Sequence, residues 1–166
     1  MKRMLGLAVL AGAAALAVLA VTAFGGTAHR AQPTGVTITP LAHATIAARV
    51  DASSSGIKIK THGPKDMLVT SIAVDPGGSF GWHTHPGPVL VSVAAGTLSL
   101  YHAEHRRHCH RDTVTAGQGF IEDGGDVHLA RNEGTTPVQL YVTFLARPGT
   151  TEFLTEVAAP AACRGL

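Results

Sequence analysis

Short segments in which apolar and polar residues alternate recur along this chain, and they restrict its fold more than any other feature. A period of two is typical of β-strands that bury one face, whereas helices need a period near 3.6. Residues that favour turns separate the segments. The segments are Val36–Thr39, Ile57–Lys60, Met67–Val74, Val89–Val93, Thr97–Tyr101, Gly119–Ile121, Val127–Ala130 and Val138–Leu145. We therefore predict an all-β domain, an antiparallel sandwich or barrel, over residues 36–148.

Two local features refine this prediction. The segment Asp75-Pro76-Gly77-Gly78 has turn chemistry and is expected to end the strand at Met67–Val74. Residues 149–166 are expected to form a C-terminal tail, in which Thr151–Val157 makes a short helix. No long amphipathic helix is expected outside the N-terminal segment.

Residues 1–28 have the pattern of a signal peptide. The basic pair Lys2-Arg3 precedes an apolar run over residues 4–24, and small residues after this run provide a cleavage site. If it is not cleaved, the same run is long enough to anchor the chain in a membrane. Both interpretations predict a secreted or extracytoplasmic body that follows a linker at residues 29–35. Any contact with a membrane is then through the N-terminal segment alone.

The balance of charge excludes one large class of partner. The chain has 13 lysines and arginines against 11 acidic residues, but Lys2 and Arg3 belong to the N-terminal segment. The remaining body is neutral, whereas proteins that bind nucleic acids usually carry a basic surface. We therefore expect no nucleic-acid partner.

Cys109 and Cys163 are the two cysteines of the chain. An even pair in an exported protein predicts a disulfide bond. Two alternatives remain open at this point. Both thiols can be unpaired, or Cys109 can serve as a metal ligand, because it lies between His108 and His110.

Three of the ten histidines have the spacing of a metal site. His83 and His85 flank one residue, so in an extended segment both imidazoles point to the same face. His128, on a later strand-like segment, can supply a third ligand. Imidazole nitrogen binds Zn, Mn, Fe, Ni or Cu, and the sequence does not choose among these divalent metals. Alternatively, hydrogen bonds alone satisfy the three histidines.

These residues resemble the two conserved motifs of the cupin superfamily. The first motif, Gly-x5-His-x-His-x3-Glu-x6-Gly, is matched at Gly77, His83, His85 and Gly96. The second motif, Gly-x5-Pro-x-Gly-x2-His-x3-Asn, is matched at Gly117, Gly125, His128 and Asn132. The resemblance implies a double-stranded β-helix, or jelly-roll barrel, with a metal in its mouth.

The sequence departs from the cupin motifs at two positions. Val89 replaces the glutamate, which is commonly the fourth metal ligand in cupins, and Asp123 replaces the proline of the second motif. Glu122 and Asp126 lie close to His128 in the sequence. Either residue can replace the missing carboxylate, orient an imidazole or carry a proton, or both can be solvated turn residues.

The resemblance implies a divalent-metal protein that acts on or binds a small polar or anionic molecule. As an enzyme it would be a metal-dependent oxygenase or isomerase, with Glu122 or Asp126 as the proton carrier. The alternatives are a non-catalytic module that binds a small ligand or a metal, and a purely structural barrel. The resemblance also implies a homodimer, because cupins often pair through their sheets.

A histidine-rich segment, residues 102–110, lies between the two motifs. It contains His102, His105, His108 and His110. We interpret it as a polar loop that Cys109 fixes in place. The alternative is a second metal or haem site at the surface.

Overall fold

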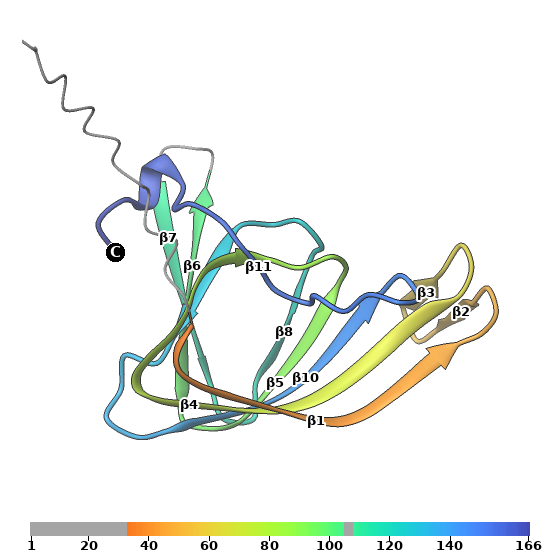
Figure 1. Ribbon diagram of the computed structural model, residues 1–166, viewed down its shortest axis with the longest axis horizontal. Coiled ribbons are helices and arrows are strands. Elements are labelled where there is room, and N and C mark those ends of the chain that lie inside the picture. The colour runs from red at the N-terminus through yellow and green to blue at the C-terminus, as the bar shows by residue number, and fades with distance from the viewer. Residues whose placement is uncertain (1–32, 105–107) are drawn as a thin grey trace, which may run out of the picture.

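The computed structural model describes residues 33–104 and 108–166, and their regular structure is almost entirely β-strand (Figure 1). The strands are β1 (Thr34–Ile46), β2 (Asp51–Ser54), β3 (Ile57–Lys60), β4 (Lys65–Thr84), β5 (Val89–Ala95), β6 (Thr97–Glu104), β7 (His108–Thr115), β8 (Gly119–Glu122), β9 (His128–Arg131), β10 (Val138–Ala146) and β11 (Thr155–Glu156). A 3₁₀ helix, η1, covers Ala161–Cys163. The prediction of an all-β fold is confirmed.

Nine of these strands form one sheet that curls into a nearly closed barrel (Figure 1). The order across the sheet is β7-β6-β9-β4-β10-β5-β8, and β1 and β11 also pair with β4. The strand β2 pairs with β3 in a separate hairpin, which lies at the end of the molecule opposite β6 and β7 (Figure 1). The antiparallel pairing agrees with the period of two in the sequence.

The long strand β4 connects the two halves of the barrel. Its first half pairs with β1 and β10, and its second half pairs with β9 and β11. The prediction that Asp75-Pro76-Gly77-Gly78 ends this strand was wrong. Two backbone hydrogen bonds, from Gly77 N to Asn132 O and from Asn132 N to Gly78 O, hold these turn-forming residues within a bent strand.

Alternate side chains of β4, β5 and β10 fill the barrel with an apolar core. Its buried members include Ile72, Val91, Leu140 and Phe144. Neighbouring residues such as Leu90 and Tyr141 are exposed on the outer face. Burial on one face is what a period of two predicts, and burying each of these large side chains contributes about 1.5–3 kcal/mol.

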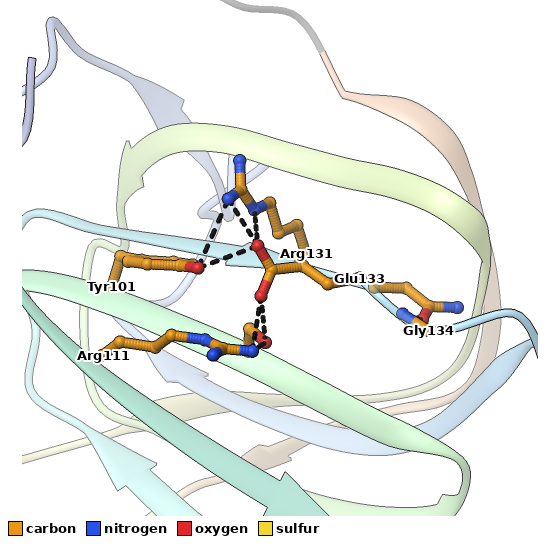
Figure 2. A network of polar contacts seen from close by, with 7 residues as sticks. Tyr101, Arg111, Arg131, Glu133 and Gly134 are labelled. Carbon is orange, nitrogen blue, oxygen red and sulfur yellow. Dashed lines mark hydrogen bonds and ion pairs between the residues drawn. The ribbon is translucent and has the colours of Figure 1, made fainter. Parts of the chain in front are cut away.

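Outside the barrel, a polar network joins β6, β7 and β9 to Glu133, which follows β9 (Figure 2). The carboxylate of Glu133 accepts hydrogen bonds from Ser99 at 2.7 Å and from Tyr101 at 2.8 Å. Arg111 and Arg131 both form ion pairs with the same carboxylate. Their guanidinium groups also lie near the Tyr101 ring. The four side chains that bind the Glu133 carboxylate thus connect neighbouring strands.

The C-terminal residues return across the barrel instead of forming a helix. The predicted helix at Thr151–Val157 was wrong, because Thr155 and Glu156 form β11 and pair with Thr84 and His83. Phe153 and Leu154 pack against the apolar core. Further along, Cys163 is bonded to Cys109 on β7, which confirms the predicted disulfide. A disulfide is typical of proteins in an oxidising compartment.

Two further predictions concern the N-terminal segment and the histidine-rich segment. The predicted leader, residues 1–28, lies outside the described residues. Within the part of the chain that is described, no helix is both long enough and apolar enough to cross a membrane. The prediction of a loop at residues 102–110 was wrong, because β6 and β7 extend into this segment and form a hairpin with each other.

Candidate metal centre

Three buried histidines converge inside the barrel. His83 lies near the end of β4, His85 follows that strand directly, and His128 begins β9. His83 and His128 are cross-strand neighbours, with ring centroids 4.2 Å apart, and the His85 ring lies 4.8 and 5.1 Å from the other two. Potential ligand atoms of all three residues lie within 4.8 Å of one another. The structure therefore brings together the three histidines that the sequence singled out.

A bulge at Gly81 directs His83 into the barrel. Phe80 and His83 both face the interior, although they are three residues apart and regular alternation would point them to opposite faces. The β4–β9 register shifts between Ser79 and Trp82, and Gly81 has a φ of 70°, in the left-handed region that glycine adopts readily. Trp82 consequently packs in an outer cluster with Cys163.

Backbone carbonyl groups orient all three imidazoles. The Nδ1 atom of His83 lies 2.9 Å from Gly81 O, that of His85 lies 2.6 Å from Phe153 O, and that of His128 lies 3.0 Å from Asp126 O. A carbonyl oxygen only accepts hydrogen bonds, so each Nδ1 carries a proton and donates it. In the neutral rings, Nε2 then keeps a lone pair available for a metal.

Glu122 supplies a carboxylate from a neighbouring strand. In the β5–β8 register Glu122 lies directly opposite Val89, the position at which cupins commonly carry their glutamate ligand. Its Oε1 is 3.0 Å from His128 Nε2, and its Oε2 is 3.3 Å from His85 Nε2. Only 13% of the side chain is exposed. The carboxylate is therefore carried by β8, and not by β5 as is common in cupins, but it still contacts the histidine cluster.

The three imidazoles fit a bound divalent ion, and Glu122 lies beside two of them. Donor atoms that share a metal at about 2.1 Å lie about 3.0 Å apart in octahedral geometry and about 3.4 Å apart in tetrahedral geometry. The two distances from Glu122 to the imidazoles, 3.0 and 3.3 Å, agree with these spacings. His128 Nε2 is also buried without the alignment of a hydrogen bond to any partner. Its charged neighbour is the Glu122 carboxylate, whose Oε1 lies 3.0 Å away.

The charges at the cluster also suit a cation. Burial, and then the neighbouring His128, lower the pKa of His83 to about 3. Burial alone would raise the pKa of Glu122, but His128 and His85 lower it to about 2. Burial likewise opposes ionisation of His128, but the Glu122 carboxylate raises the pKa of this ring. At neutral pH the cluster thus contains an ionised carboxylate in a buried position, whose charge a protonated His128 or a bound divalent ion would balance.

Asp126 is placed differently from Glu122. It precedes β9 in a turn in which its backbone N donates to Asp123 O, and it is exposed. Its backbone carbonyl is the group that orients His128. Its proposed part as a proton carrier remains a prediction.

Comparison with known proteins agrees with the residues of the cluster. A family model described as a cupin domain matches residues 70–144, which include His83, His85, Glu122 and His128. Residues 70–144 are a cupin domain. Germin-like protein 5-1 of Oryza sativa subsp. japonica is 31% identical over 86 residues, which are 51% of this chain and 39% of that protein. The chain therefore spans about two-fifths of the rice protein.

Solved structures similar to this chain include two from bacteria. One is the cupin domain of an XRE-family transcriptional regulator from Enterobacter cloacae, at 18% identity and a TM-score of 0.45, covering 69% of this chain and 99% of that one. Another is oxalate decarboxylase from Bacillus subtilis, at 12% identity and a TM-score of 0.48, covering 55% and 24% of the two chains.

Two hollows meet at Glu122. The first, of about 360 Å³, is lined mostly by apolar side chains and has His83, His85 and Glu122 in its wall. The second, of about 610 Å³, has Glu122, Asp126 and His128 in its wall. Phe153, from the C-terminal segment, lines the first hollow and also supplies the carbonyl that orients His85. No motif pointed to Phe153, because its part depends on the path of the chain after β10.

Proposed function

We propose that this chain is an exported cupin that binds one divalent metal ion and a small molecule beside it. The metal ligands are Nε2 of His83, His85 and His128 and the carboxylate of Glu122. The observation that carries the proposal is the convergence of three imidazoles, each oriented through Nδ1 by a backbone carbonyl, with a carboxylate beside two of them. A mixed nitrogen and oxygen donor set suits Zn, Mn, Fe, Ni or Cu.

Each protein group has a separate part in this centre. The Nδ1 hydrogen bonds keep the rings in the tautomer whose Nε2 lone pair is free. The rings therefore need no tautomer change before they bind a metal. Glu122 supplies the negative charge that Val89 cannot. When bound, the ion supplies Lewis acidity, which polarises a coordinated oxygen of a bound molecule.

The apolar hollow defines the class of small molecule. Its volume of about 360 Å³ is at the small end of the range for ligand pockets, and the cluster forms its polar part. We infer a ligand with an apolar body, which contacts side chains such as Leu140 and Phe144, and a polar or anionic head directed at the cluster. In a catalytic cupin, a Glu122 oxygen facing this head would hold the transferred proton.

A non-catalytic binding module is the second candidate. The mostly apolar wall of the first hollow favours this second candidate, because few of its side chains can exchange a proton. Besides Glu122, the acidic residue in the wall is Glu152. The two candidates share the metal site and the small ligand. Turnover of a bound molecule by the metal-loaded protein distinguishes them.

The decisive experiment measures metal content and affinity in the full chain. After reconstitution and dialysis, elemental analysis should find about one tightly held ion per chain. His128→Ala should abolish this binding, and Glu122→Gln should weaken it at least tenfold. Asp126→Asn is the matched control: it lies in the same segment and keeps the backbone carbonyl that orients His128, so affinity should stay within about twofold. Equal affinities of Glu122→Gln and the native chain would contradict the proposed carboxylate ligand.

Export is the part of the proposal that concerns localisation. The disulfide between Cys109 and Cys163 supports an oxidising compartment. The mass of the intact protein isolated from the producing cells tests it. Loss of residues 1–28 supports cleavage, and a full-length mass in the membrane fraction supports the retained anchor.

A further inference from the structure

A second group of metal-binding side chains lies on the β6–β7 hairpin. The register places His102 of β6 directly opposite His110 of β7. Directly opposite residues in an antiparallel pair project from the same face, and so do residues two apart on one strand. Asp112 therefore shares the face of His110, and Glu104 shares the face of His102. His108, opposite Glu104, shares this face as well, so the hairpin gathers three imidazoles and two carboxylates on it.

The distances within this group suit a metal site. One potential ligand atom from each of His102, His110 and Asp112 lies within 4.8 Å of the others. The Asp112 carboxylate lies between the two rings, with Oδ1 3.1 Å from His110 Nε2 and Oδ2 3.9 Å from His102 Nδ1. The ring centroids are 5.0 Å apart. All three side chains are partly exposed, so their rotamers have room to change.

The charge around the group favours a cation. Glu104 Oε2 lies 3.9 Å from His110 Nδ1, which adds a second carboxylate beside the rings. Arg111 stands between His110 and Asp112 in the sequence, but its side chain points to the opposite face, where it pairs with Glu133 and donates to Ser99 (Figure 2). The Glu133 network therefore removes this positive charge from the histidine face.

The geometry points to a second divalent-metal site, which we propose is formed by His102, His110 and Asp112. Between 44% and 53% of these side chains is exposed, so the ion keeps water ligands and exchanges readily. Two imidazoles and one carboxylate suit Zn, Ni or Cu. The site is separate from the buried cluster but close to it. His102 pairs in register with His128, and His102 and Asp112 line the open hollow that also contains Glu122.

Titration of the tag-free full chain with Zn²⁺ in a calorimeter tests this site. We expect two classes of binding in the native chain, a tight ion at the buried cluster and a weaker second ion. His110→Ala and Asp112→Asn should each remove the weaker class. Glu122→Gln should weaken only the tight class. If the buried cluster binds no zinc, the weaker class should still appear, so failure of the proposed function is distinguishable from failure of this site.

His62→Ala is the matched control. His62 is an exposed histidine that follows β3 in the sequence, and the β2–β3 hairpin lies at the end of the molecule opposite β6 and β7 (Figure 1). The substitution should leave both classes unchanged, and the melting temperature of each metal-free variant should show that the fold is kept. The proposal is overturned if the native chain lacks the weaker class, or if His110→Ala and Asp112→Asn both retain it. Loss of that class in His62→Ala would overturn it as well.

Discussion

Removing the disulfide should destabilise the barrel by a calculable amount. The bond joins Cys109 on β7 to Cys163 at the end of the chain and closes a loop with a sequence separation of 54. For a loop of this length, the lost entropy of the unfolded chain gives a stabilisation of about 4 kcal/mol. At about 3–4 °C per kcal/mol for a domain of this size, the melting temperature of Cys109→Ala/Cys163→Ala should fall by roughly 12–16 °C.

The same substitution should also weaken metal binding, because the bonded segment contains Phe153. The carbonyl of Phe153 accepts the hydrogen bond of His85 Nδ1, and residues 155–156 pair with β4 beside His83. A C-terminal segment released at Cys163 leaves this region more often, so His85 is less well oriented. Disruption of a group that orients a metal ligand typically lowers affinity 10–100-fold.

The assay combines thermal unfolding, followed by circular dichroism, with metal titration below the melting temperature. Native protein treated with dithiothreitol is the matched control, because reduction breaks the bond without deleting atoms. It should reproduce the lower melting temperature of the double variant. A variant that melts within about 3 °C of the native protein would refute the reasoning. If the variant has the expected melting temperature but an unchanged metal affinity, the proposed effect through Phe153 is refuted.

Three further predictions concern stability and pH. Glu133→Gln should cost about 1–2 kcal/mol at pH 7, after allowance for partial exposure. Burial opposes ionisation of Glu133, but hydrogen bonds with Ser99 and Tyr101 and the ion pair with Arg131 lower its pKa to about 2. The stabilisation is therefore complete above the ordinary carboxyl pKa and is lost as the pH falls towards 2. Unfolding measured at several pH values would reveal this loss. Asn132→Ala should cost about 1–3 kcal/mol in urea unfolding, because it leaves buried backbone groups without partners. Metal affinity should fall on acidification, since protons compete for the imidazoles, and a pH-independent dissociation constant would contradict imidazole ligation.

The histidine cluster was accessible from the sequence because its spacing is local. His83 and His85 are two residues apart, and the second motif places His128 at a fixed distance from its glycines. The period of two was likewise enough for the all-β fold. Such features need only the chemistry of neighbouring residues.

The position of Glu122 required the register between β5 and β8, which the sequence leaves open. The sequence showed that Val89 cannot bind a metal and that acidic residues lie near His128, but only pairing of Val89 with Glu122 selects this carboxylate over Asp126. The course of β4 and the β6–β7 hairpin were mispredicted for a related reason. Cross-strand hydrogen bonds, such as those between Asn132 and Gly77 or Gly78, outweighed the local preference for a turn.

The main-chain hydrogen bonds of the three imidazoles have a consequence for how this barrel can diversify. The carbonyl groups of Asp126 and Phe153 exist whatever side chains those residues carry. Mutations that reshape the apolar hollow can therefore accumulate without turning the rings out of position. Descendants of this chain could therefore change the shape of the apolar hollow while the three imidazoles keep their orientation.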